Sequence, residues 1–135
     1  MIPNILPILG RIDIGYLLGE ALNLSRRSVR EVVRKASEIL DLCSNWEPIR
    51  KFSRDIRTML DMLAAYLDGE YTDVPWPTIA LAAFALLYLL NPLDLVPDAI
   101  PFLGQLDDAA VLTIVLDSVR SELKKFRQFR RRRAA

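Results

Sequence analysis

Apolar residues recur every three or four positions in two stretches of the chain, residues 28–42 and 45–69. This spacing places them on one face of a helix and predicts two amphipathic helices. Ser28, with Glu31 three positions later, fits a capping box at the start of the first helix. Gly69 would end the second, because glycine readily adopts the left-handed backbone that follows a helix. A shorter helix is predicted over residues 13–22, with Asp13 as its N-cap.

Residues 78–90 contain no charged side chain and are apolar on every side. A helix of this kind lies in the centre of a bundle or inside a bilayer. Apolar positions recur again up to residue 129, and a segment rich in proline and aspartate separates this last predicted helix from the apolar one. We therefore expect an all-α fold, a compact bundle of about five helices around a central apolar helical hairpin, about 77–90 and 108–129. The whole chain, 1–135, is predicted to be a single domain.

The composition excludes several kinds of chemistry. The chain of 135 residues has no histidine and one cysteine, Cys43. Catalytic triads that use histidine and zinc sites with histidine ligands are therefore excluded, as are an intramolecular disulfide and a thiolate metal cluster. We expect a protein that is not an enzyme, in a cytosolic or membrane-facing location rather than a secreted one.

The net charge of +1 hides a strong asymmetry along the chain. Eight basic residues and one acidic residue lie between Arg120 and Ala135, so the residues before them carry a net charge of −6. Residues 126–135 are predicted to form a basic tail that seeks an anionic partner.

Aromatic side chains alternate with the basic ones near the end of the chain, and this mixture suits two kinds of polyanion. On an anionic membrane the basic groups would meet headgroups while the phenylalanines insert. With nucleic acid, which we favour less, they would pair with phosphates and stack on bases. The alternative is a solvated helix end whose cations suit the helix dipole. The candidate contact residues are Lys124, Lys125, Phe126, Arg127, Phe129, Arg130, Arg131, Arg132 and Arg133.

Residues 2–13 and 96–107 resemble each other at an offset of 94 positions. Both copies contain two prolines, followed by a leucine, a glycine and an aspartate at matching places. Proline suits the start of a short turn, glycine its end, and aspartate the cap of the helix that follows. We interpret this internal repeat as two equivalent starts of helices that lie side by side, with Asp13 corresponding to Asp107.

The segment NPLDLVPDAIPFLGQLDD, residues 91–108, follows the apolar helix and precedes the last one. In this arrangement the chain resembles the YkvA-like family of small bacterial proteins, whose pattern is an apolar helix, the run S-P-I-D-L-I-P-D-x-I-P-x-x-G-x-x-D-D and a second apolar helix. Asn91 replaces the usual serine, and Leu93 and Val96 are conservative variants. The resemblance covers about residues 74–125. It implies a helical hairpin that is often membrane-associated, in a family without an established activity whose domain is also attached to a membrane-embedded eukaryotic RING ubiquitin ligase.

Aspartates in this segment have two interpretations. Asp94, Asp98 and Asp108 could converge to hold Mg²⁺ or Ca²⁺, which prefer oxygen ligands, or could share a proton. Helix capping explains the same residues without a ligand: Asn91 would be an N-cap with Asp94 in the first turn, and Asp107 would cap the last helix. We favour capping and expect no cofactor, with a Mg²⁺ or Ca²⁺ site as the alternative.

The predicted central helix is short for a membrane span. Residues 78–90 make a helix of about 20 Å, against a hydrocarbon core of about 30 Å. The sequence favours a non-catalytic interaction module associated with the cytoplasmic side of the cell membrane, and a soluble cytoplasmic protein is the alternative. A divalent-metal site or enzyme at the aspartates, and a protein-binding adaptor or immunity-type partner, are the other functions that the sequence leaves open.

Overall fold

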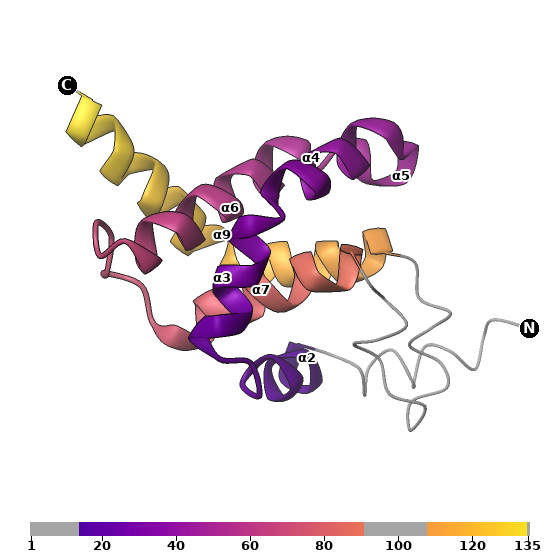
Figure 1. Cartoon of the computed structure of the whole chain (residues 1–135), viewed down its shortest axis with the longest axis horizontal. Coiled ribbons are helices and arrows are strands. Elements are labelled where there is room, and N and C mark those ends of the chain that lie inside the picture. Colours follow the sequence, from indigo (N-terminus) through magenta and orange to yellow (C-terminus); the bar gives the residue numbers. More distant parts are fainter. Residues whose placement is uncertain (1–13, 91–107, 135) are drawn as a thin grey trace, which may run out of the picture.

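The computed structural model describes residues 14–90 and 108–134 (Figure 1). Several predictions fall outside these ranges: the caps at Asp13, Asn91 and Asp107, the metal ligands Asp94 and Asp98, and both copies of the internal repeat. Asp108 is the first residue of the last helix, and its side chain also lies outside the described part.

All regular structure in the described residues is helical, which confirms the all-α prediction. The helices pack around one continuous apolar core. In chain order they are α2 (Ile14–Ala21), α3 (Arg26–Arg34), α4 (Ala36–Asn45), α5 (Glu47–Arg50), α6 (Ser53–Leu67), α7 (Trp76–Leu90) and α9 (Asp108–Ala134).

Helix α7 is the centre of the bundle. Every residue from Ile79 to Leu86 is buried, as are Tyr88 and Leu89. The helix packs against α2, α3, α4, α6 and α9, so other parts of the same chain cover its apolar surface (Figure 1). Burying such a surface is the main force that stabilises a helical bundle. Within residues 14–90 and 108–134, no helix is both long enough and apolar enough to cross a membrane.

The predicted pairing of α7 with the last helix is confirmed, since α9 packs along α7 more extensively than on any other helix. Its buried residues recur at helical spacing, from Val111 through Val115 and Val119 to Leu123 and Phe126. Helix α9 continues beyond the predicted end at Phe129 to Ala134, so the predicted start of the tail at residue 126 falls inside a helix. In Figure 1 the end of α9, drawn in yellow at the upper left, extends beyond α6.

The predicted cap at Ser28 is wrong by one turn. The N-cap of α3 is Ser25, whose side chain accepts a hydrogen bond from the backbone N–H of Ser28. Ser28 is the third helical residue, and its hydroxyl accepts from the Ser25 N–H at 3.3 Å, which completes a capping box of two serines. The sequence pattern pointed to Ser28 and Glu31 because a glutamate is the more common partner of such a box.

Two bends divide the predicted amphipathic helices. Residues 28–42 are shared between α3 and α4, because the backbone of Lys35 leaves the helical region (φ −98°, ψ 19°). Of residues 45–69, Asn45 is the last residue of α4, and the rest contain α5 and α6, with Phe52 at the break between these two helices. The apolar spacing continues across both bends, and for this reason the sequence pattern predicted one helix where the structure has two, α3 with α4 and α5 with α6.

Gly69 ends α6 as predicted. Its φ of +77° lies in the left-handed region, where a residue with a side chain is strained. The Gly69 N–H donates to the Tyr66 carbonyl at 3.2 Å and the Glu70 N–H donates to the Ala65 carbonyl at 3.0 Å. These two hydrogen bonds form a Schellman motif, which turns the chain into the connector toward α7.

Candidate anion-binding surface on the last helix

The end of α9 is packed onto the bundle through its aromatic residues. Phe126 is 1% exposed and belongs to the core. Tyr71, from the connector between α6 and α7, lies 5.0 Å from the Phe126 ring and 4.7 Å from the Phe129 ring, between ring centroids. Phe126 is therefore not available to insert into lipid or stack on bases, and that prediction is wrong because the helix turns this face to the core. Phe129 is partly buried on the same side.

Acidic residues of α6 and of the connector meet the basic residues of this helix end. The Lys125–Asp73 hydrogen bond raises the pKa of Lys125. Four ion pairs join the two regions, measured between nitrogen and oxygen: Lys125–Asp73 at 3.2 Å, Arg127–Asp55 at 2.7 Å, Arg130–Asp61 at 2.6 Å and Arg133–Glu70 at 3.8 Å. These pairs explain why the helix continues where the sequence predicted a tail.

The pair between Arg127 and Asp55 is the least exposed of the four, with about a quarter of each side chain accessible. The same Arg127 nitrogen, Nη2, also lies 3.3 Å from the hydroxyl of Thr58 and donates a hydrogen bond to it. Thr58 is buried, and its hydroxyl donates in turn to the backbone carbonyl of Arg54 at 3.0 Å. Arg127 is thus fixed in position by two groups on α6.

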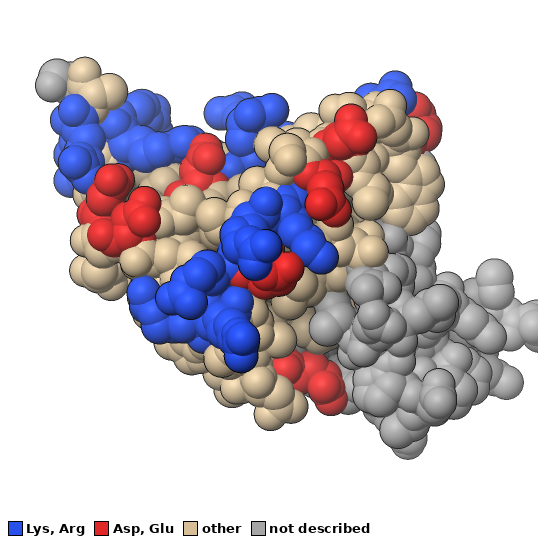
Figure 2. Space-filling view, viewed as in Figure 1, with Lys and Arg blue, Asp and Glu red and all other residues tan. Residues whose placement is uncertain are grey.

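Three predicted contact residues are left without an acidic partner among the described residues. Lys124, Arg131 and Arg132 are exposed and take part in no ion pair there. Figure 2 shows lysine and arginine side chains gathered over the end of α9, at the upper left of the view. Positive charge that no acidic side chain balances can attract an anionic partner.

A groove of about 510 Å³ lies between α6 and the end of α9. Five of its lining residues are arginines and one is acidic: Arg54, Arg57, Arg127, Arg130, Arg131 and Asp61. We call this the arginine groove. Arg54 and Arg57 come from α6, are exposed and form no ion pair with another described residue. The lining side chains carry a net charge of +4, which favours an anionic ligand.

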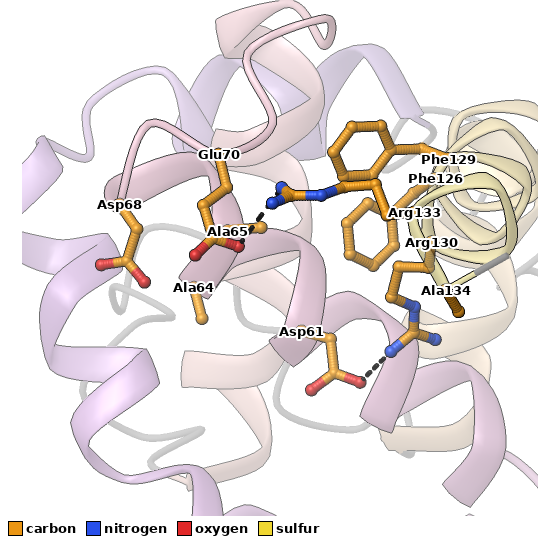
Figure 3. Close-up of a pocket in the computed structure, with 10 residues that line it drawn as sticks. All are labelled: Asp61, Ala64, Ala65, Asp68, Glu70, Phe126, Phe129, Arg130, Arg133 and Ala134. Atoms are coloured by element: carbon orange, nitrogen blue, oxygen red, sulfur yellow. Dashed lines mark hydrogen bonds and ion pairs between the residues drawn. The ribbon is translucent and has the colours of Figure 1, made fainter.

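A second groove, of about 560 Å³, lies on the other side of the Arg130–Asp61 pair (Figure 3). Phe126, Phe129 and the alanines of α6 give it an apolar lining. Asp68 and Glu70 stand at one side, and Glu70 is paired with Arg133. The lining carries three acidic and two basic residues, so this groove does not share the positive charge of its neighbour.

Sequence reasoning missed Arg54 and Arg57, because charged residues are expected on the solvated face of any amphipathic helix. Their spacing of three positions, with Asp61 four further on, does place them on one face. The spacing of charged residues in the sequence does not indicate that α9 lies beside that face of α6.

The described residues contain no group of three or more cysteine, aspartate or glutamate side chains placed to hold a metal ion. The proposed ligands Asp94, Asp98 and the side chain of Asp108 are outside those residues, so the prediction of a Mg²⁺ or Ca²⁺ site is untested. Cys43 is buried, and burial raises the pKa of its thiol. A raised thiol pKa disfavours the reactive thiolate.

The fold and this surface define a small all-helical protein with a buried apolar helix and a cationic helix end. Residues 78–114 match the family described as "Protein of unknown function (DUF1232)". The chain is 36% identical over 81 residues to "Uncharacterized membrane protein YkvA" of Bacillus subtilis (strain 168), which covers 60% of this chain and 76% of that protein. The chain therefore belongs to the YkvA-like family of unknown function. No solved structure matches it significantly.

The family match spans α7 and the first part of α9. The residues of the arginine groove lie outside this matched segment, so the match assigns no role to them.

Proposed function

We propose that this protein is a non-catalytic interaction module that attaches to the anionic surface of a cell membrane through the end of α9. The observation that carries the proposal is the surplus of positive charge there: Lys124, Arg131 and Arg132 are exposed and have no acidic partner in the described ranges. A Bacillus relative that is named as a membrane protein supports the same location.

Attachment at the membrane surface, without insertion, agrees with the burial of the apolar residues inside the bundle. Helix α7 buries its side chains against five other helices, and Phe126 is in the core, so the described residues leave little apolar surface for insertion. Electrostatic attraction is then the main force toward the membrane. We place the contact on the cytoplasmic side, because anionic lipids give that leaflet a negative surface potential.

The three unpaired cations set the expected strength of attachment. A basic side chain close to an anionic bilayer contributes about 1 kcal/mol, so Lys124, Arg131 and Arg132 together contribute about 3 kcal/mol. This corresponds to roughly a 100-fold change in affinity. The interaction should weaken steeply with salt, because exposed charges are screened over about 10 Å at an ionic strength of 0.1 M.

Co-sedimentation with vesicles tests the proposal. Wild-type protein and the triple variant K124Q/R131Q/R132Q are mixed with phosphatidylcholine vesicles that contain or lack phosphatidylserine. We expect wild type to bind only the anionic vesicles, and the triple variant to bind them roughly 100-fold more weakly.

The matched control is R34Q/R50Q/R120Q. It removes the same charge from three exposed arginines, each of which already has an acidic partner three positions before it. This control should bind nearly as well as wild type. The proposal is overturned if wild type does not bind anionic vesicles, if the control loses as much affinity as the triple variant, or if an oligonucleotide binds at the same salt concentration when vesicles do not.

A further inference from the structure

We infer that the arginine groove is a binding site for a phosphomonoester, a phosphate group with one organic substituent and close to two negative charges. The inference rests on the proposed function, since it names the headgroup that the cationic end of the protein would select. The attachment is carried by Lys124, Arg131 and Arg132. The groove shares Arg131 with it and adds four arginines that the attachment does not use, Arg54, Arg57, Arg127 and Arg130.

Two of the arginines in the groove are held in place before any ligand binds. Arg127 is fixed by Asp55 and Thr58 on α6. Arg130 is fixed by Asp61 at 2.6 Å, and its guanidinium lies 4.9 Å from the centre of the Phe126 ring. Holding a side chain in its bound position lowers the entropy cost of binding.

These two arginines keep hydrogen-bond donors for a ligand. A guanidinium has five N–H groups. Arg127 uses Nη2 for both of its partners, and Arg130 uses Nη1 for Asp61. The remaining N–H groups can donate to phosphate oxygens, and arginine suits phosphate because its planar fork makes two parallel hydrogen bonds.

The other arginines in the groove supply charge that is not yet compensated. Arg54 and Arg57 from α6 and Arg131 from α9 line the groove and form no ion pair within the described part of the chain. The one acidic residue in the lining, Asp61, is already engaged by Arg130. An anion that enters the groove therefore meets cations from both helices.

This arrangement favours a phosphomonoester over a phosphodiester or a carboxylate. A phosphomonoester carries a charge of about −1.5 to −2 at pH 7 and presents three acceptor oxygens. A phosphodiester carries one charge and a carboxylate has only two oxygens, so neither engages guanidinium groups from two helices as fully. The neighbouring groove, whose lining carries three acidic and two basic residues, lacks this surplus of positive charge.

The phosphomonoester could belong to a lipid headgroup, as in phosphatidic acid, or to a soluble phosphate, and one experiment separates the two sources. In the first arm, inorganic phosphate is titrated into the protein and the side-chain Nε–H resonances of the arginines are followed by NMR. In the second arm, binding is compared between vesicles that contain phosphatidic acid and vesicles that contain phosphatidylserine at equal surface charge.

We expect phosphate to shift the resonances of Arg127 and Arg130 at concentrations at which chloride does not. We also expect phosphatidic acid vesicles to bind about tenfold more tightly than charge-matched phosphatidylserine vesicles. The variant R54Q/R57Q should lose both effects and keep its binding to phosphatidylserine. Its control, R34Q/R50Q, removes two exposed, paired arginines elsewhere and should keep both effects.

The outcomes distinguish this inference from the proposed function. Equal binding to both anionic vesicles, without a phosphate-dependent shift, overturns the arginine groove as a phosphate site and leaves membrane attachment intact. A phosphate-dependent shift in wild type that R54Q/R57Q abolishes, without binding to any vesicle, overturns membrane attachment and supports a soluble phosphate ligand. Because Arg54 and Arg57 are exposed and without ion-pair partners, the variant should fold, and a urea midpoint equal to that of wild type verifies this.

Discussion

Two ion pairs between α6 and α9 have almost the same length and differ in exposure, which makes them a direct test of what holds the helix end in place. Arg127–Asp55 measures 2.7 Å, and its side chains are 24% and 26% exposed. Arg130–Asp61 measures 2.6 Å, and its side chains are 45% and 44% exposed. We predict that the first pair stabilises the fold about three times as much as the second.

The magnitudes follow from the surroundings of each pair. A hydrogen bond to a charged group contributes about 1.5–3 kcal/mol, and the partial exposure of Arg127 and Asp55 places this pair near the lower bound, about 1.5 kcal/mol. The second hydrogen bond, from Arg127 to Thr58, limits the freedom of the guanidinium and adds to the same effect. The side chains of Arg130 and Asp61 are nearly half exposed, so we expect this pair to contribute about 0.5 kcal/mol to stability, as exposed ion pairs generally do.

Double-mutant cycles in urea measure both values. The first cycle uses D55N, R127Q and the double variant, and the second uses D61N, R130Q and their double variant; the coupling energy of each cycle isolates the pair. Raising the salt concentration to about 1 M shortens the screening length to about 3 Å and should remove most of the second coupling and less of the first. Equal couplings, or a larger one for Arg130–Asp61, would refute the argument that burial sets the difference.

Three further substitutions test the core and the connector. Phe126→Ala should lower the free energy of unfolding by about 3–5 kcal/mol because Phe126 is fully buried, and the exposed Gln128→Ala should change the urea midpoint little. Gly69→Ala should lower the free energy of unfolding by about 1–2 kcal/mol, because the φ of +77° at Gly69 is strained for alanine. No atom lies within 4 Å of the added Cβ, so a clash adds nothing to this cost. An unchanged free energy of unfolding would show that the turn relaxes. Burial raises the pKa of Tyr71 above its ordinary 10.0, so its contribution to stability is complete below pH 10.0 and is lost as the pH rises through the folded-state value. Tyr71→Phe should abolish this alkaline loss in urea titrations and leave stability at neutral pH equal or higher, because the Tyr71 hydroxyl has no hydrogen-bond partner among the described residues.

The central part of the fold could be predicted from the sequence because its signal is local. Residues 78–90 are apolar on every side, and such a segment has only two stable locations, a protein interior or a bilayer. The apolar spacing along 108–129 identified the partner helix, and Gly69 marked the end of α6 by the conformation that glycine permits. Each of these properties depends on one short stretch of sequence.

The candidate site could be predicted only in part, because it depends on contacts between distant segments. The sequence showed that the end of the chain is basic, and it did not show which acidic residues would neutralise it. Asp55 and Asp61 lie about 70 positions before the arginines that they bind. Arg54 and Arg57 became part of a groove only because α9 packs beside α6. Alternation of phenylalanine with arginine predicted a lipid-facing surface, whereas Phe126 is buried in the core and its ring packs against Tyr71, a residue far away in the sequence.

The basic residues near the end of the chain therefore fall into two groups, those with an acidic partner and those without one. Acidic residues of the first half and the connector pair with some of the late basic residues, and these pairs, with Arg127–Asp55 foremost, hold the end of α9 on the bundle. Lys124, Arg131 and Arg132 have no such partner, and neighbouring like charges gain nothing from being close together in the folded state. The stability of the fold and the binding to anionic vesicles should therefore depend on different basic residues. Neutralising the three unpaired cations should leave the urea midpoint unchanged or slightly raised while weakening binding to anionic vesicles, whereas Arg127→Gln should lower the midpoint, because the end of α9 would lose its best-buried anchor.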